Sequence, residues 1–274
     1  MKQAIGVIDS GVGGLTVAHE LMRQLPKEKL IYLGDTSRCP YGPRSKEEVQ
    51  QFTWEMVNFL LEKDIKMLVV ACNTATAFAL QSLKENLNIP VIGVIQPGSR
   101  AAIKFTKTNH VGIIGTEGTV RSNAYTNALK NIKDELEVSA LACPMFVPMV
   151  EQGILEGQQA REVVEDTLSP LLQYSKMDTL ILGCTHYPLL KNTIQSVVGE
   201  EITIISSSEE TARETSTILD VHHLLNKDDY YPVHQFYTTG DLEIFIEISR
   251  SIFKEPHLQM VTIEQANLHQ LQDS

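Results

Sequence analysis

Short, continuously apolar segments recur along this chain, and they restrict its fold more than any other feature. Because their residues do not alternate between apolar and polar, they are typical of strands covered on both faces, as in a parallel sheet. Amphipathic helical patterns lie between them, one of which starts at a capping-box sequence, Ser45–Glu48. This alternation predicts an α/β fold with right-handed crossovers. The apolar segments are Ala4–Ile8, Leu30–Leu33, Met67–Ala71, Val91–Ile95, Val111–Ile114, Thr179–Leu182 and Ile202–Ile205.

Two of these segments end in the same way, at positions 72 and 184. One runs into Ala71–Cys72–Asn73–Thr74 and the other into Gly183–Cys184–Thr185–His186. A buried cysteine is usually a small apolar residue. Polar neighbours at the carboxyl end of a strand favour a functional role instead, because α/β sheets bind ligands at this edge. Two matched thiols suit a reaction that needs an acid and a base on opposite faces of one carbon.

The two halves of the chain also resemble each other near their first strands. Ile5–Ile8 leads into Asp9–Gly14, and Val111–Ile114 leads into Gly115–Gly118 in a similar manner. This offset of 106 residues is close to the offset of 112 between the cysteines. A duplicated unit is therefore predicted, with chance similarity of apolar strands as the alternative. The best candidate break between units is a turn around Gln96–Gly98.

Size and charge narrow the class of protein. The chain has 274 residues, 43% of them hydrophobic, enough for one large or two modest domains. Its formal net charge of -11 argues against nucleic acid as a partner, because a nucleic-acid surface needs a basic face. No secretory signal and no membrane span is visible, so a cytoplasmic location away from the membrane is expected. The cysteines form no CxxC pair and His222–His223 lacks an HExxH context, so no metal site is expected.

Three loops carry further candidate residues, each with a purely structural alternative. The glycine-rich Asp9–Gly14 suits close approach to a carboxylate or phosphate, but it matches neither the dinucleotide fingerprint nor the P-loop. Asp9 either caps the next helix or assists a nearby thiol. The loop Cys39–Arg44 either shapes a pocket or merely connects two elements. His186 either caps a helix or acts as the proton partner of Cys184, although a Cys–His hydrolase would leave the other thiol unexplained.

Together these residues closely resemble the glutamate racemases of the cofactor-independent aspartate/glutamate racemase superfamily. The resemblance spans nearly the whole chain in the family's order, and the ordered set is specific although each piece is weak alone. The matching pieces are Asp9–Gly14, Tyr41–Gly42, Ala71–Ala75, Pro148–Gly153 and Gly183–Pro188.

The resemblance implies two pseudo-symmetric, parallel-sheet α/β domains that face each other across a cleft. Residues 1–97 and 208–274 would form a discontinuous first domain, which carries Cys72. Residues 98–207 would form the second domain, which carries Cys184.

The resemblance also implies a reaction, the interconversion of L- and D-glutamate by proton transfer at Cα without a cofactor. Cys72 would deprotonate D-glutamate while Cys184 protonates the opposite face, and the roles would reverse for L-glutamate. Asp9 is similar to the family's helper of Cys72 and His186 to that of Cys184, with Glu151 a third ionisable candidate. The implied substrate contacts are Asp9, Ser10, Tyr41, Gly42, Asn73, Thr74, Thr185 and His186, and the symmetry of the halves adds Thr116.

The family's role is to supply D-glutamate for peptidoglycan, and its members are commonly dimers, so a homodimer is expected. Two rival functions stay open. An aspartate racemase would differ by one methylene in its substrate. A ligand-binding protein would close two domains over a small anion without any reaction.

Overall fold

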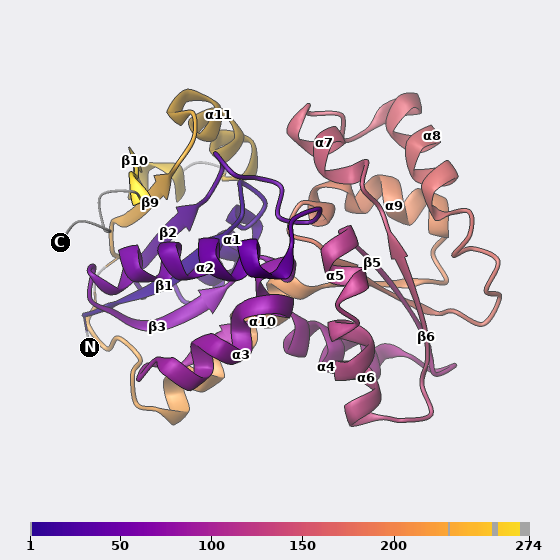
Figure 1. Ribbon diagram of the computed structural model, residues 1–274, viewed down its shortest axis with the longest axis horizontal. Coiled ribbons are helices and arrows are strands. Elements are labelled where there is room, and N and C mark those ends of the chain that lie inside the picture. Colours follow the sequence, from indigo (N-terminus) through magenta and orange to yellow (C-terminus); the bar gives the residue numbers. More distant parts are fainter. Residues whose placement is uncertain (1, 230, 254–256, 269–274) are drawn as a thin grey trace.

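The computed structural model describes residues 2–229, 231–253 and 257–268, and these residues form two parallel β-sheets flanked by helices (Figure 1). Within them, the first sheet has six strands in the order β10-β9-β2-β1-β3-β4. The second has four strands in the order β6-β5-β7-β8. Every pair of neighbouring strands is parallel. The predicted α/β fold with two parallel-sheet units is confirmed.

The first sheet is assembled from two separate stretches of the chain. Its strands are β1 (Ala4–Asp9), β2 (Leu30–Gly34), β3 (Ile65–Val70), β4 (Val91–Gly93), β9 (His234–Thr238) and β10 (Val261–Gln265). The second sheet consists of β5 (His110–Gly115), β6 (Glu137–Ala142), β7 (Thr179–Gly183) and β8 (Thr203–Ser206). The chain therefore leaves the first sheet after β4 and returns to it at β9. This path agrees with a discontinuous first domain, while the bounds at residues 97 and 208 stay predictions.

Helices pack on the faces of both sheets. The helices of the first unit are α1 (Leu15–Gln24), α2 (Lys46–Leu61), α3 (Asn73–Asn86) and α11 (Leu242–Ile252), with the 3-10 turn η2 (His257–Met260). Those of the second unit are α5 (Glu117–Arg121), α6 (Ala124–Ile132), α7 (Phe146–Glu151), α8 (Gly157–Leu168), η1 (Tyr187–Leu190) and α9 (Lys191–Val198). Helices α4 (Ile95–Phe105) and α10 (Ser207–Val221) pack against each other where the two units meet (Figure 1). No helix of the described residues is long and apolar enough to cross a membrane.

The two sheets share one strand order. Four neighbouring strands of the first sheet lie in the order β2-β1-β3-β4, and the second sheet has the order β6-β5-β7-β8. If the strands of each unit are numbered along the chain, both orders read second, first, third, fourth. The two cysteine-bearing strand ends, after β3 and after β7, occupy the same place in this order. The shared order supports the predicted duplicated unit, to which β9 and β10 are an addition on one edge.

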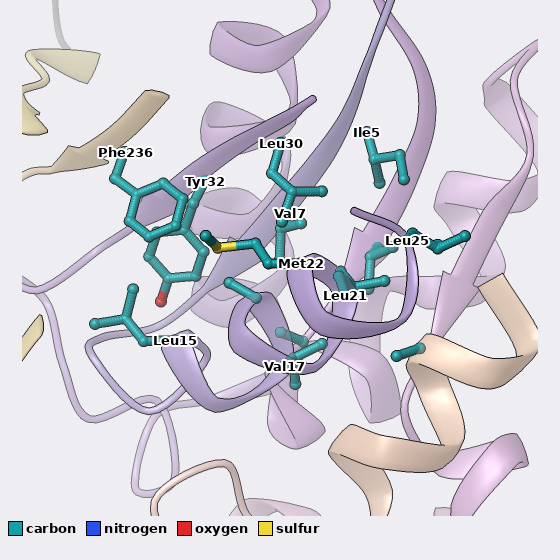
Figure 2. Packing of buried hydrophobic residues seen from close by; sticks show 14 of the residues in the cluster. Ile5, Val7, Leu15, Val17, Leu21, Met22, Leu25, Leu30, Tyr32 and Phe236 are labelled. Carbon is teal, nitrogen blue, oxygen red and sulfur yellow. The ribbon is translucent and has the colours of Figure 1, made fainter. Parts of the chain in front are cut away.

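Alternate residues of β1 serve opposite cores, which is why the strand is apolar throughout. Ile5 and Val7 point toward α1 and belong to the core cluster that contains Leu21 and Tyr32 (Figure 2). Ile8, on the opposite face, belongs to the core beneath α2 and α3. The capping box predicted at the start of α2 is also present, because Ser45 and Glu48 each bond the other's backbone N–H.

Three strands, the end of a fourth and one helix differ from the sequence expectation. The apolar pattern misses β6, β9 and β10, because β6 is a partly exposed edge strand and the other two mix polar with apolar residues. The predicted turn at Gln96–Gly98 is wrong, since these residues lie inside α4. Pro97 stands in the first turn of that helix, where its missing N–H has no bond to lose. Gly93 ends β4, so the strand expected up to Ile95 is shorter.

A buried ion pair joins the first sheet to the segment after α10. Nζ of Lys66 lies 2.6 Å from Oε2 of Glu28 and donates to the carbonyl of Leu224 at 2.7 Å. The side chains of both charged partners are at most 3% exposed. Removing one charge of such a pair leaves the other uncompensated in a low-dielectric surrounding.

We expect Glu28→Gln to lower the free energy of unfolding by about 3–5 kcal/mol, because the substitution strands the Lys66 charge. Urea unfolding followed by circular dichroism measures this loss. Glu165→Gln is the matched control, since Glu165 pairs with Arg161 on the exposed face of α8 and such pairs contribute about 0–1 kcal/mol. Equal midpoints for the two variants would contradict the expectation.

Candidate active site

Cys72 stands between β3 and α3, where it is the N-cap residue of the helix. Its Sγ accepts a hydrogen bond from the backbone N–H of Ala75 at 3.4 Å, and its thiol donates to Oγ of Ser10 at 3.4 Å. Burial, reinforced by the carboxylate of Asp9, raises the pKa of Cys72 to about 12 against the opposing effect of these two bonds. Cys72 is therefore a protonated thiol at neutral pH in this structure.

Cys184 follows β7 and faces an imidazole. Its Sγ lies 3.9 Å from Nδ1 of His186, and Nε2 of the same ring lies 3.4 Å from Oε1 of Glu151 at the end of α7. Burial lowers the pKa of His186, but the contacts with Cys184 and Glu151 outweigh it and raise this pKa to about 10. The contact with His186 in turn is the main cause that lowers the pKa of Glu151. His186 is thus an imidazolium at neutral pH, a proton source beside the second thiol.

Asp9 ends β1 and is fully buried. Its Oδ2 accepts from the backbone N–H of Gly11 at 3.0 Å, and its Oδ1 accepts from the hydroxyl of Thr185 at 3.3 Å. Burial raises the pKa of Asp9, although the charge of His186 and these hydrogen bonds oppose the rise. Since Thr185 follows β7, the Asp9 carboxylate links the first unit to the second.

The glycine-rich loop after β1 packs directly on the segment after β7. A Cβ at Gly13 would lie 2.4 Å from Oγ1 of Thr185 and 2.5 Å from Nδ1 of His186. Thr16, in the first turn of α1, adds a hydroxyl bond to the carbonyl of Thr185 at 3.2 Å. Position 13 thus has no room for a side chain, and the loop fixes the placement of the imidazole.

Hydroxyl and amide groups gather beside the thiols. Oγ1 of Thr74 lies 2.9 Å from Oγ1 of Thr116 and 3.3 Å from Oγ1 of Thr119. The hydroxyl of Tyr125 donates to Oδ1 of Asn73 at 2.7 Å. Nδ2 of Asn73 is buried and, among the described residues, has no hydrogen-bond partner. These groups are neutral and can bind carboxylates by donating hydrogen bonds.

The loop after β2 forms one wall of the site, because Tyr41 and Gly42 line its cavity. The hydroxyl of Tyr41 donates to Oδ2 of the buried Asp35 at 2.5 Å, which anchors the loop to the sheet edge. Gly42 meets the second unit, because a Cβ there would lie 2.8 Å from Cβ of Thr116. The loop therefore contacts both units at once.

One small cavity connects these groups. Among the sequence-predicted residues, Asp9 and Glu151 are not part of its lining, since Asp9 lies beneath the loop and Glu151 reaches it through His186. The sequence analysis missed Val147, which lines the cavity, and two residues that bond to lining residues, Thr119 and Tyr125. Only Thr119 had a signal in the sequence, its spacing of three residues from Thr116. The cavity is lined by Ser10, Cys39, Pro40, Tyr41, Gly42, Cys72, Asn73, Thr74, Thr116, Val147, Cys184, Thr185 and His186. The loop that starts at Cys39 was expected either to shape a pocket or merely to connect two elements, and Cys39 lines the cavity.

We expect Glu151→Gln to shift the pH dependence of catalysis. The carboxylate helps to raise the pKa of His186 to about 10. Without the carboxylate this pKa is lower, so the imidazolium loses its proton at lower pH. Activity that needs this proton source should then decline on the alkaline side about one pH unit earlier than in the unmodified protein. Profiles of kcat against pH from 6 to about 10.5 measure the shift, and superimposable alkaline limbs would contradict it.

Comparison with known proteins agrees with this architecture. Residues 5–215 match the Asp/Glu/Hydantoin racemase family. A glutamate racemase of Oceanobacillus iheyensis is 72% identical over 98% of this chain and 98% of its own length. Among solved structures, a glutamate racemase isoform from Bacillus anthracis has a TM-score of 0.93 at 49% identity, covering 98% of this chain and 99% of that one.

A glutamate racemase from Francisella tularensis, solved in complex with D-glutamate, has a TM-score of 0.89 at 34% identity and covers 98% of this chain and 99% of that one. The family match covers more than half of this chain, and the similarity to the relative from Oceanobacillus extends over nearly all of it. The chain therefore belongs to the Asp/Glu/hydantoin racemase family.

Proposed function

We propose that this protein is a glutamate racemase that interconverts L- and D-glutamate by proton transfer at Cα between two thiols. The observation that carries the proposal is the placement of Cys72 and Cys184 in one cavity. The two thiols extend from equivalent strand ends of two different sheets. Thiols approaching from two units can address opposite faces of one carbon, which a racemase requires and a hydrolase does not. The curated relatives named glutamate racemase support the same substrate.

The surrounding groups suit an amino acid with two carboxylates. Nδ2 of Asn73 and the hydroxyls of Thr74 and Thr116 line the cavity and can donate to carboxylate oxygens. Thr185 also lines the cavity, with its hydroxyl donating to Asp9. No arginine or lysine is part of that lining. A set of neutral, preorganised donors in a water-poor site stabilises negative charge as it develops on the substrate.

The two thiols have different helpers. In the D-to-L direction Cys72 first passes its thiol proton to the carboxylate of Asp9 and then, as a thiolate beside the amide of Ala75, removes the α-proton, while Cys184 delivers its own proton to the other face. His186, supported by Glu151, then reprotonates Cys184, and solvent carries the proton held by Asp9 back to His186. In the L-to-D direction the roles reverse. Tyr41, Gly42 and Ser10 complete the substrate contacts, and the scheme needs no cofactor because both proton carriers are side chains.

We also propose that the enzyme acts in the cytoplasm as a homodimer and supplies D-glutamate for peptidoglycan. The expected partners are glutamate and a second copy of the chain, and no nucleic acid. Sedimentation at micromolar concentration tests the dimer, and a monomer at all concentrations would remove it from the proposal.

Isotope exchange at Cα tests the proposed reaction. Incubated with pure L-glutamate in heavy water, the purified protein should produce D-glutamate that carries deuterium at Cα, as read by mass spectrometry after chiral separation. Binding of glutamate without any label would support a ligand-binding protein instead. Faster turnover of L-aspartate than of L-glutamate would support the aspartate racemase alternative.

A further inference from the structure

A third thiol lies in the cavity beside the two proposed proton carriers. Sγ of Cys39 lies 3.5 Å from Oε1 of Glu151, and a Cβ at Gly11 would lie 2.9 Å from this sulfur. The thiol is therefore enclosed between the loop after β1 and the end of α7. The scheme above gives it no role.

Cys39 can only act as a donor in this place. Burial, together with the charges of Glu151 and Asp9, raises its pKa far above the usual value, so the group stays S–H throughout the working range of pH. The bond therefore runs from the thiol to the carboxylate oxygen. A thiol is a weak donor, but here its acceptor is charged, which strengthens the bond.

Glu151 needs such a restraint. Its side chain is 39% exposed, so its carboxylate can rotate toward water. The oxygen that accepts from Cys39 is Oε1, the same atom that lies 3.4 Å from Nε2 of His186. A bond that fixes this oxygen thus fixes the partner of the imidazole.

We infer that Cys39 is a positioning residue that holds the Glu151 carboxylate against His186 and so maintains the proton supply to Cys184. The contacts form a chain from Cys39 through Glu151 and His186 to the thiol of Cys184. Its kinetic readout rests on the proposed racemase function. The ionisable groups that act on the imidazole are Cys184 and Glu151 in the second unit and Asp9 at the end of β1.

Cys39→Ala, Cys39→Ser and Glu151→Gln, with the double variants, test the inference. Cys39→Ala removes the donor, so the alkaline limb of the kcat profile should move to lower pH by about half a unit. Cys39→Ser keeps a donor and should restore most of this shift. In the Glu151→Gln background, Cys39→Ala should cause no further shift, because the carboxylate through which it acts is gone. Cys143→Ala controls for the loss of a buried thiol that does not line the cavity, and circular dichroism verifies folding.

Three results would overturn the inference: an unchanged alkaline limb in Cys39→Ala, a serine variant no better than alanine, or shifts that add fully in the double variant. An effect on KM alone that persists in the Glu151→Gln background would mean that Cys39 contacts the substrate directly. Each of these patterns differs from the expected one.

A second readout does not depend on turnover. In protein labelled with ¹⁵N-histidine, the His186 signal is identified by its loss in His186→Gln, and its pKa is followed by NMR. This pKa should fall in Cys39→Ala and recover in Cys39→Ser. If the unmodified protein failed to racemise glutamate, the proposed function would fall, while this titration would still decide the role of Cys39.

Discussion

Cys72→Ala and Cys184→Ala should each lose racemase turnover by at least ~1,000-fold while the protein remains folded. Each substitution removes the only proton carrier proposed for one face of Cα, and a positioned acid or base contributes about 10²- to 10⁴-fold. Initial rates in both directions, followed by chiral chromatography, measure the loss. Circular dichroism on the same samples shows whether the fold is retained.

The two variants should also differ in isotope exchange. Cys184→Ala keeps the thiol proposed to deprotonate D-glutamate, so in heavy water it should label D-glutamate more than L-glutamate. Cys72→Ala should show the opposite preference. Cys143→Ala is the matched control, because Cys143 is buried in the second unit but does not line the site cavity. Near-normal turnover in either cavity variant would end the two-thiol assignment.

Gly13→Ala should lower kcat by about 100-fold although it adds a single methyl group at a residue that does not line the cavity. The new Cβ would fall 2.4 Å from Oγ1 of Thr185 and 2.5 Å from Nδ1 of His186. Either the imidazole must turn away from Cys184 or the two units must separate, and a displacement of about 1 Å can cost about 10²-fold in rate. Steady-state kinetics in both directions measure the effect.

Gly98→Ala is the control for this substitution. Gly98 lies within α4, and the nearest atom to a Cβ there, Cβ of Ser207, is 3.3 Å away. The control variant should retain turnover within a few-fold, since its neighbour needs to yield by only a few tenths of an ångström. If Gly13→Ala behaved like the control, the units would be farther apart during catalysis than in this structure.

Local pattern in the sequence was enough to locate the two thiols. Cys72 and Cys184 follow continuously apolar strands and precede polar residues, and parallel strands place such ends at one edge of a sheet. The capping box at Ser45 is equally local, because its bonds join residues three apart. The sequence pattern likewise indicated the repeat, since both halves use the same succession of elements.

Tertiary structure decided how those ends meet. The contact between Glu151 and His186, the bond from Tyr125 to Asn73 and the close approach at Gly13 join residues from different elements, most of them distant in sequence. Nothing in the spacing of these residues encodes such contacts.

The strands that the apolar sequence pattern did not predict also depend on tertiary structure. Strand β9 mixes polar and apolar residues, and its place beside β2 depends on the return of the chain to the first sheet through α10. The sequence by itself determined the α/β class, the repeated unit and the two cysteine-bearing strand ends, because periodicity and residue type act locally. Only the packing of distant elements determined that Glu151 meets His186 and that Thr185 bonds Asp9, because hydrogen bonds and excluded volume between such elements exist only in the folded chain.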